Sequence, residues 1–147
     1  MADRSLYIIK PEAMEFRTLI RDEIRSVGLD ILRYTQLIIP VGILDALYPE
    51  LGPELREATH RFMGSSDCEV GEVGGALAVQ MLTDLCGGFT DPSCCGPSTI
   101  RGRFGKKCPE HIGNATYYRN AIHRPKDQFE ADRDLALFAD ILKIEEY

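Results

Sequence analysis

The stretch Ser5-Leu6-Tyr7-Ile8-Ile9-Lys10-Pro11 decides more about the fold of this sequence than any other. Its first five residues form a short, mainly apolar and β-prone run, which Lys10 and Pro11 end. The pattern predicts a buried strand with a lysine at its carboxyl end. Apolar residues then recur with helical spacing between Leu19 and Val27, and Gly28 stands where a helix commonly ends. Residues 29–39 predict a second strand.

The rest of the chain adds helices to this beginning. Four segments have patterns of regular structure, namely a short helix over 43–48, a helix that begins at Pro53 and ends at Gly64, a short strand at 121–122 and a helix over 128–142. Residues 64–75 are glycine-rich and weakly apolar, which predicts a loop with a poor strand. Residues 76–86 fit either a strand or a helix. The order of elements favours an α/β or α+β sandwich with helices packed on a small sheet.

Length and composition predict a single globular domain over residues 1–147. The chain is 44% hydrophobic and 27% charged, and none of its apolar runs reaches the roughly 18 residues that a membrane helix needs. Residues 1–4 lack the pattern of a signal peptide, so a cytoplasmic location is expected. Five cysteines without CxxC spacing predict reduced thiols rather than a zinc site.

Charge is distributed unevenly along the chain. Residues 98–126 contain seven Lys or Arg residues and one acidic residue, Glu110. Their net charge is therefore +6, which leaves −12 for the remainder of a chain whose net charge is −6. Such a basic segment indicates a local site for a small anion, and a solvated loop is the alternative. Binding to nucleic acid is not expected, because the acidic remainder would repel a long polyanion.

One histidine lies inside this basic segment. His123 ends the run Arg119-Asn120-Ala121-Ile122-His123, and Asp134 follows eleven residues later on the predicted last helix. If that helix packs back across the turn, its carboxylate fixes the tautomer of the imidazole and makes the ring a better nucleophile. The alternative is a partly exposed histidine beside an arginine. The sequence has no GxxxxGK[ST], GxGxxG, HExxH or GxSxG motif.

Four collinear motifs resemble those of nucleoside diphosphate kinases. Residues 5–13 resemble the opening strand and "IKPDA" turn of that family, and Thr90-Asp91-Pro92 with residues 97–105 resemble its "TNP…PGTIRGDFG" loop. Residues 119–123 are similar to "RNxxH", and residues 134–138 resemble "EIALF". The chain is identified on these motifs as a divergent member of the family.

The resemblance implies a fold and a reaction. The fold is a ferredoxin-like α+β sandwich, in which helices cover a four-stranded antiparallel sheet. The reaction is ping-pong transfer of the γ-phosphate of a nucleoside triphosphate, such as ATP, to a nucleoside diphosphate through a phosphohistidine. Mg²⁺ would accompany the nucleotide, held mostly by phosphate oxygens and water, with no metal ligands from the protein. The family also implies a homo-oligomer, either a hexamer or a tetramer.

The resemblance also assigns roles to individual residues. It implies His123, Asp134, Lys10 and Tyr48 as catalytic residues, with His123 as the nucleophile. The nucleotide-binding positions that it implies are Lys10, Leu55, Thr90, Arg101 and Asn120. Cations and hydroxyl donors suit this chemistry, because phosphoryl transfer depends mainly on electrostatic positioning of the phosphates.

Several positions depart from the family pattern. Asp84 stands where the family has a phosphate-contacting arginine, Pro125 replaces a serine, Asp134 replaces a glutamate, and Leu55 replaces a base-stacking phenylalanine. Extra residues also separate Phe104 from Arg119. A catalytically weak or inactive nucleotide-binding or scaffold domain is therefore the alternative function, as in divergent ciliary or flagellar members. An unrelated small α/β binding module is a third.

Two basic residues outside the family pattern are candidates to replace the phosphate-contacting arginine that is missing at position 84. Arg103 replaces an acidic residue of the family, and Arg124 directly follows the proposed nucleophile. We hypothesise that these arginines recover phosphate affinity lost at Asp84.

Overall fold

The apolar stretch at residues 5–9 lies in β1 (Asp3–Ile9), an inner strand of a four-stranded antiparallel sheet in the computed structural model. The order of the strands is β2 (Asp30–Leu37), β3 (Cys68–Gly75), β1 and β6 (Ile122–His123). The structure describes residues 3–143. The predicted fold class, a ferredoxin-like α+β sandwich, is confirmed.

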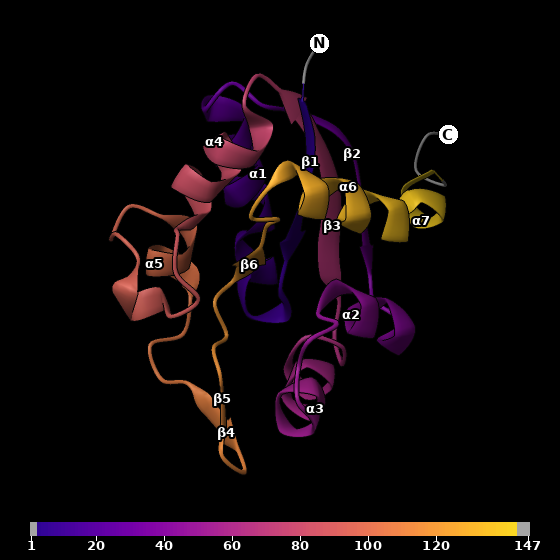
Figure 1. Cartoon of the computed structure of the whole chain (residues 1–147). Coiled ribbons are helices and arrows are strands. Elements are labelled where there is room, and N and C mark those ends of the chain that lie inside the picture. Colours follow the sequence, from indigo (N-terminus) through magenta and orange to yellow (C-terminus); the bar gives the residue numbers. More distant parts are fainter. Residues whose placement is uncertain (1–2, 144–147) are drawn as a thin grey trace.

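Helices cover both faces of this sheet, and alternation along β1 explains why. Tyr7 and Ile9 face one buried core, whereas Leu6 and Ile8 face the other. Figure 1 shows the two helical layers on opposite sides of the strands. One layer contains α1 (Arg17–Ser26), α4 (Ala78–Cys86) and α5 (Ile100–Phe104), and the other contains α2 (Val41–Leu47), α6 (Gln128–Leu137) and α7 (Ala139–Lys143).

The prediction of a loop with a poor strand over residues 64–75 is only partly right, because most of this segment is β3, an inner strand of the sheet. Gly71 pairs with Tyr7, and a Cβ atom at position 71 would collide with the Tyr7 ring. Glu69 is fully buried, and its carboxylate accepts hydrogen bonds from the Tyr7 hydroxyl (2.7 Å) and Arg21 Nε (3.1 Å). Gly71 and Glu69 make this segment resemble a loop in the sequence. They are accommodated in a strand because Tyr7 and Arg21 lie beside them in the folded chain.

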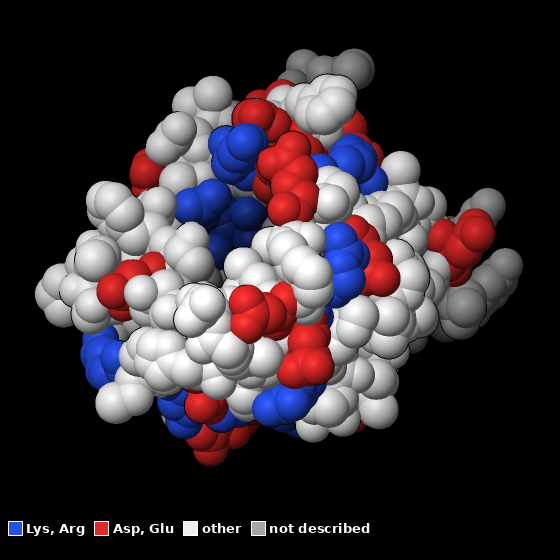
Figure 2. Space-filling model, turned by 60° about the horizontal axis from the view of Figure 1, so that its bottom comes forward, with Lys and Arg blue, Asp and Glu red and all other residues white. Residues whose placement is uncertain are grey.

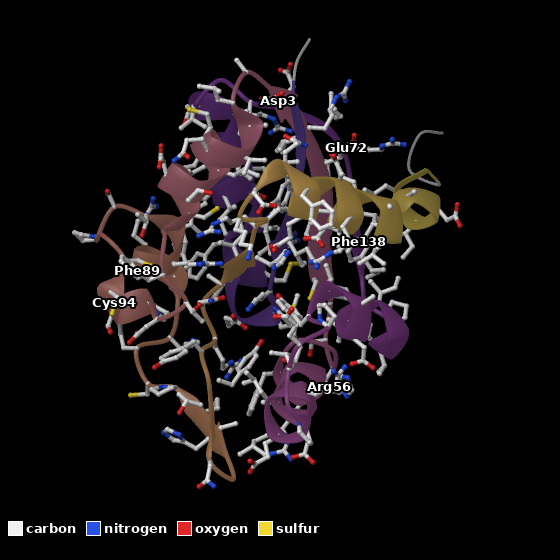
Figure 3. All side chains as sticks on the ribbon, in the orientation of Figure 1. Asp3, Arg56, Glu72, Phe89, Cys94 and Phe138 are labelled. Atoms are coloured by element: carbon white, nitrogen blue, oxygen red, sulfur yellow. The ribbon has the colours of Figure 1, made fainter. Side chains whose placement is uncertain are left out.

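Other predicted elements agree more closely with the structure. The ambiguous segment 76–86 forms helix α4, and α3 (Pro53–Phe62) begins at Pro53 as predicted. The single helix predicted over 128–142 is wrong in one respect, because it is two helices that meet at Phe138. The Phe138 ring, labelled in Figure 3, is fully buried in the core beside Leu6 and Ile8.

The extra residues before Arg119 form a separate hairpin. Its strands are β4 (Glu110–Ile112) and β5 (Ala115–Tyr117), and it lies beside α3 (Figure 1). Two contacts fix it there. The backbone N–H of Asn114 donates to Glu54 Oε2 (3.0 Å), and the Tyr117 ring stacks on Phe62 with 5.5 Å between centroids. The hairpin is therefore attached to α3 at its tip and at its base.

Residues 1–2 and 144–147 of the predicted domain lie outside the described residues. In residues 3–143, none of the helices combines the length and apolar character required to span a membrane. The five cysteines are free.

Candidate active site

The residues assigned to the site by sequence motifs surround one cavity of about 290 Å³. Those that line it are Lys10, Tyr48, Leu55, Thr90, Arg101, Asn120 and His123. Asp134 lies behind His123 and contacts its ring. Figure 2 shows a hollow on this face of the molecule with Lys and Arg atoms inside it. In Figure 3, Phe89 marks the loop on one side of the site and Arg56 marks α3 on the other.

The pairing of β1 with β6 brings the lysine and the histidine together. Ile8 is opposite His123, and the backbone N–H of Lys10 donates to Ala121 O (2.8 Å). Ala121 has a φ of 78°, in the left-handed region that residues other than glycine rarely adopt. Its N–H donates to Glu12 Oε2 (2.9 Å), so a buried carboxylate holds this turn in place directly before β6.

Both ring nitrogens of His123 have hydrogen-bond partners. Nε2 lies 2.9 Å from Asp134 Oδ2, and Nδ1 lies 3.0 Å from the Tyr48 hydroxyl. Burial lowers the pKa of His123 below its ordinary value, and the cations Lys10 and Arg101 lower it further, whereas Asp134 opposes this shift. This shift favours the neutral form of the ring. In this network Nε2 donates to Asp134, and Nδ1 holds the lone pair and accepts from Tyr48.

Helix α6 places Asp134 behind the histidine. The side chain of Asp127 caps this helix by accepting from the Glu130 N–H (2.8 Å), so α6 begins shortly after β6 ends. Asp134 is fully buried on the face of α6 that packs against β1. Although its side chain is shorter than the glutamate of the family pattern, it reaches Nε2 directly.

Two buried cations line the cavity. Arg101 Nε and Nη2 donate to Ile122 O (3.1 and 2.9 Å), and Nη1 donates to Phe89 O (3.0 Å). Burial lowers the pKa of Lys10 to about 8, although Glu12 acts in the opposite direction. Burial also lowers the pKa of Arg101. Because the hydrogen bonds of Arg101 go to neutral carbonyls, its charge remains available to an anion in the cavity.

The remaining predicted residues complete the walls. Asn120 Nδ2 donates to Thr90 O (3.0 Å) and so ties the loop at Thr90 to the turn before β6. Asn120 Oδ1 is buried and has no hydrogen-bond partner among the residues that the structure describes. Leu55 contributes an apolar surface from α3. These residues can thus accept or pack against a ligand that carries both polar and apolar parts.

Sequence reasoning missed part of the wall. Five further residues line the cavity, namely Leu51 before α3, Thr59 on α3, and Thr116, Tyr117 and Tyr118 at the end of the hairpin. Tyr117 is buried, and the Lys10 Nζ lies 5.4 Å from the centroid of its ring. The excess length between Phe104 and Arg119 was the available signal, but length alone does not show which way the hairpin folds.

The departures from the family pattern occupy different environments. Asp84 is exposed on α4, where its carboxylate accepts from Gln80 Nε2 (2.8 Å), and it is not among the residues that line the cavity. Arg103 is bonded to Glu23 and also lies away from the cavity lining. Arg124 Nη2 donates to Gly87 O (3.0 Å), and the positive charge of Arg124 contributes to lowering the pKa of Arg101. Of the two arginines considered for compensation, only Arg124 is near the phosphate-binding candidates.

Carboxylate ligands for a metal are scarce at this cavity. Its lining contains none, and the part of the chain that the structure describes has no group of three or more His, Cys, Asp or Glu residues placed to hold a metal ion. The described residues therefore offer no carboxylate set for a metal ion at this cavity.

Fold and site together define an α+β protein with a histidine and two cations around one cavity, and sequence comparison gives the family. The family model "nucleoside diphosphate kinase" matches residues 3–143, so this chain belongs to the nucleoside diphosphate kinase family. The nucleoside diphosphate kinase of Pyrococcus furiosus is 32% identical, with 99% of this chain and 88% of that protein covered. That of Methanocaldococcus jannaschii is 26% identical, with 94% of each chain covered.

Solved structures show the same fold. The nucleoside diphosphate kinase of Halobacterium salinarum in complex with CDP superposes with a TM-score of 0.81 at 22% identity, with 94% of this chain and 88% of that chain covered. A transition state mimic of the Borrelia burgdorferi enzyme with vanadate and ADP gives 0.77 at 23% identity, with 93% and 86% covered. The single domain over 1–147 and the hexamer or tetramer stay predictions.

Proposed function

We propose that this chain is an active nucleoside diphosphate kinase that transfers the γ-phosphate through a phosphohistidine at His123. One observation carries the proposal. A buried imidazole, held by Asp134 at Nε2, shares a cavity with Lys10 and Arg101. A neutral ring with its lone pair on Nδ1 is the form of histidine that can attack phosphorus. Family membership supports the same reaction class.

The proposed reaction has two half-steps through the same residues. Nδ1 attacks the γ-phosphorus, the bond from phosphorus to the β–γ bridging oxygen breaks, and the nucleoside diphosphate leaves with those electrons. A second nucleoside diphosphate then attacks the phosphohistidine and regenerates the ring. Lys10 and Arg101 would stabilise charge on the transferring oxygens, and Asp134 would stabilise the positive charge that develops on the imidazole.

Tyr48 would change partner during the first half-step. Burial raises the pKa of Tyr48 well above its ordinary value, so its hydroxyl stays protonated. Before reaction it donates to Nδ1 of His123. When the phosphoryl group occupies Nδ1, we propose that the hydroxyl donates to a phosphoryl oxygen instead.

The nucleotide would extend from His123 toward α3 and the hairpin. We propose that Thr90 and Asn120 contact its phosphate and sugar, with Asn120 Oδ1 gaining its missing partner from a sugar hydroxyl. Leu55 would pack against the base, opposite the tyrosines of the hairpin. Mg²⁺, where it accompanies the nucleotide, supplies charge neutralisation between phosphates.

The test is a labelling experiment on the full chain. The protein is incubated with γ-labelled ATP and Mg²⁺, separated from nucleotide and then mixed with GDP. We expect an acid-labile label on the protein that transfers to GDP as labelled GTP. A protein that binds ATP but acquires no label and makes no GTP would refute the kinase proposal and support the scaffold alternative.

The pKa of Lys10 predicts an alkaline limit to the reaction. Because burial lowers that pKa to about 8, the free protein loses this positive charge as the pH rises through that value. We expect kcat/KM for ATP to fall above about pH 8, since kcat/KM follows ionisation of the free enzyme. Measurement of kcat/KM between neutral and alkaline pH checks this.

Two variants identify the titrating group. Lys10→Arg should remove the alkaline decline whatever its effect on the plateau, because a guanidinium does not titrate in this range. Lys106→Arg, at an exposed position, should keep it. If the decline persists in Lys10→Arg, another group causes it.

A further inference from the structure

Arg133 touches the catalytic network without lining the nucleotide cavity. Its Nε and Nη2 donate to Oδ1 of Asp134 (3.1 and 2.9 Å), the oxygen that His123 does not use. Asp134 is fully buried, whereas the side chain of Arg133 is one-third exposed. The buried carboxylate is therefore shared between an imidazole on one oxygen and a guanidinium on the other.

The Arg133 guanidinium also contacts the end of α2, directly before Tyr48, the second hydrogen-bond partner of His123. Arg133 Nη2 also donates to Leu47 O (3.1 Å), at the end of α2, and the next residue is Tyr48. Arg133 thus links α6 to the carboxyl end of α2. Asp134 lies on α6 and Tyr48 directly follows α2, and their side chains contact Nε2 and Nδ1 of His123.

We propose that Arg133 is a positioning residue for His123, which fixes both hydrogen-bond partners of the imidazole and holds it in its neutral, Nε2-protonated form. The proposal rests on the proposed function, because it concerns the same histidine. It requires no contact between Arg133 and the nucleotide. Arg133 belongs to none of the motifs on which the family resemblance rests.

Charge gives the direction of the effect. With Arg133 removed, Asp134 loses two donors and a nearby cation, and its carboxylate then favours a protonated imidazole more strongly. A protonated ring has no lone pair for attack on phosphorus. The other groups around the His123 ring are unchanged by this substitution; they are Lys10 on β1, Arg101 on α5, Tyr48 after α2, Lys126 in the turn before α6 and Glu130 on α6.

The loss of orientation is separate from the loss of charge. A lysine at position 133 retains a cation but has no planar fork to bind Asp134 through two nitrogens and Leu47 O at once. Arg133→Lys should therefore keep most of the charge effect and lose part of the orientation. Arg133→Gln should lose both. The two variants thus separate the two contributions.

The experiment follows the His123 ring directly and then its reaction. Imidazole NMR signals of the full chain are titrated without nucleotide in wild type, Arg133→Gln and Arg133→Lys. The chain has only three histidines, so assignment is simple. The rate of labelling by γ-labelled ATP is measured across the same pH range. Arg25→Gln is the matched control, because Arg25 forms an exposed ion pair with Asp22 on α1, away from the cavity.

We expect Arg133→Gln to raise the pH at which His123 titrates by about half to one unit. The acid limb of labelling should move in the same direction, and its plateau should fall on the order of tenfold. In Arg133→Lys, His123 should titrate closer to the wild-type pH than it does in Arg133→Gln. The labelling plateau of Arg133→Lys should lie between those of Arg133→Gln and wild type. Arg25→Gln should match wild type in both measurements.

Two results would overturn the proposal. One is an unchanged His123 titration in a folded Arg133→Gln protein. The other is an equal loss of labelling at every pH in both variants, which indicates a purely structural role. Because the NMR titration needs no kinase activity, it stands even if wild type acquires no label, in which case the proposed function fails and the positioning of His123 is still tested. If Arg133→Gln does not fold, the labelling plateau of Arg133→Lys decides, and a plateau equal to that of wild type would overturn the proposal.

Discussion

Replacement of His123 by alanine is expected to abolish the acid-labile label and to lower nucleoside diphosphate kinase activity on the order of 10⁴-fold or more. The reason is that the imidazole is the only nucleophile proposed for the site. Lys10 and Arg101 remain in the cavity, so the affinity for ATP should change little. Label incorporation, GTP formation and calorimetric ATP binding measure the three quantities on one preparation.

The matched control for this variant is His60→Ala. His60 lies on α3 and its Nε2 contacts Asp45 on the surface (2.7 Å), away from the cavity lining. It should keep both label and activity. Persistence of acid-labile label in His123→Ala would place the phosphorylated residue elsewhere and would contradict the assignment of His123.

Replacement of Arg101 by glutamine is expected to lower kcat/KM for ATP on the order of 10² to 10³-fold. Glutamine removes a buried cation of the cavity lining, the one proposed to contact the phosphates. It also removes the paired hydrogen bonds to Ile122 O, which steady the strand residue directly before His123. Steady-state kinetics with ATP and GDP measure the effect, and circular dichroism verifies that the variant is folded.

The control lies two residues further along the same helix. Arg103 is bonded to Glu23 and its guanidinium lies 4.7 Å from the centroid of the Phe104 ring, so Arg103→Gln makes the same chemical change outside the cavity. It should leave kcat/KM nearly unchanged. Equal losses in the two variants would show that α5 as a whole, and not the charge of Arg101, determines activity.

Strand β1 shows what the sequence could predict about the fold. Its continuous apolar run is sufficient to identify a buried strand, and local pattern carries that information. For strand β3, local pattern predicts only a poor strand within a loop. Gly71 is required by the Tyr7 ring, and Glu69 is tolerated because Tyr7 and Arg21 donate to it. Both reasons lie more than forty residues away along the chain.

The same distinction between local pattern and tertiary packing applies to the residues of the site. Motifs identified part of the cavity lining. They also identified the pair His123 and Asp134, because spacing along β6 and α6 brings the two side chains together. Motifs could not identify Tyr117, which depends on how the hairpin packs on Phe62. They also predicted an anion at Asp84 close to the phosphates, whereas the helix turns that side chain toward Gln80 and solvent.

The left-handed backbone at Ala121 has a consequence for how the protein could evolve. A non-glycine residue in this conformation costs roughly 1 kcal/mol, and the surrounding contacts must offset it. Glycine would relieve that cost, but it would also widen the range of directions from which Ile122 and His123 leave the turn. A substitution that relieves this strain would thus weaken the preorganisation of His123, the proposed nucleophile. Residue 121 is a point of trade-off between stability and activity, where selection for one opposes selection for the other.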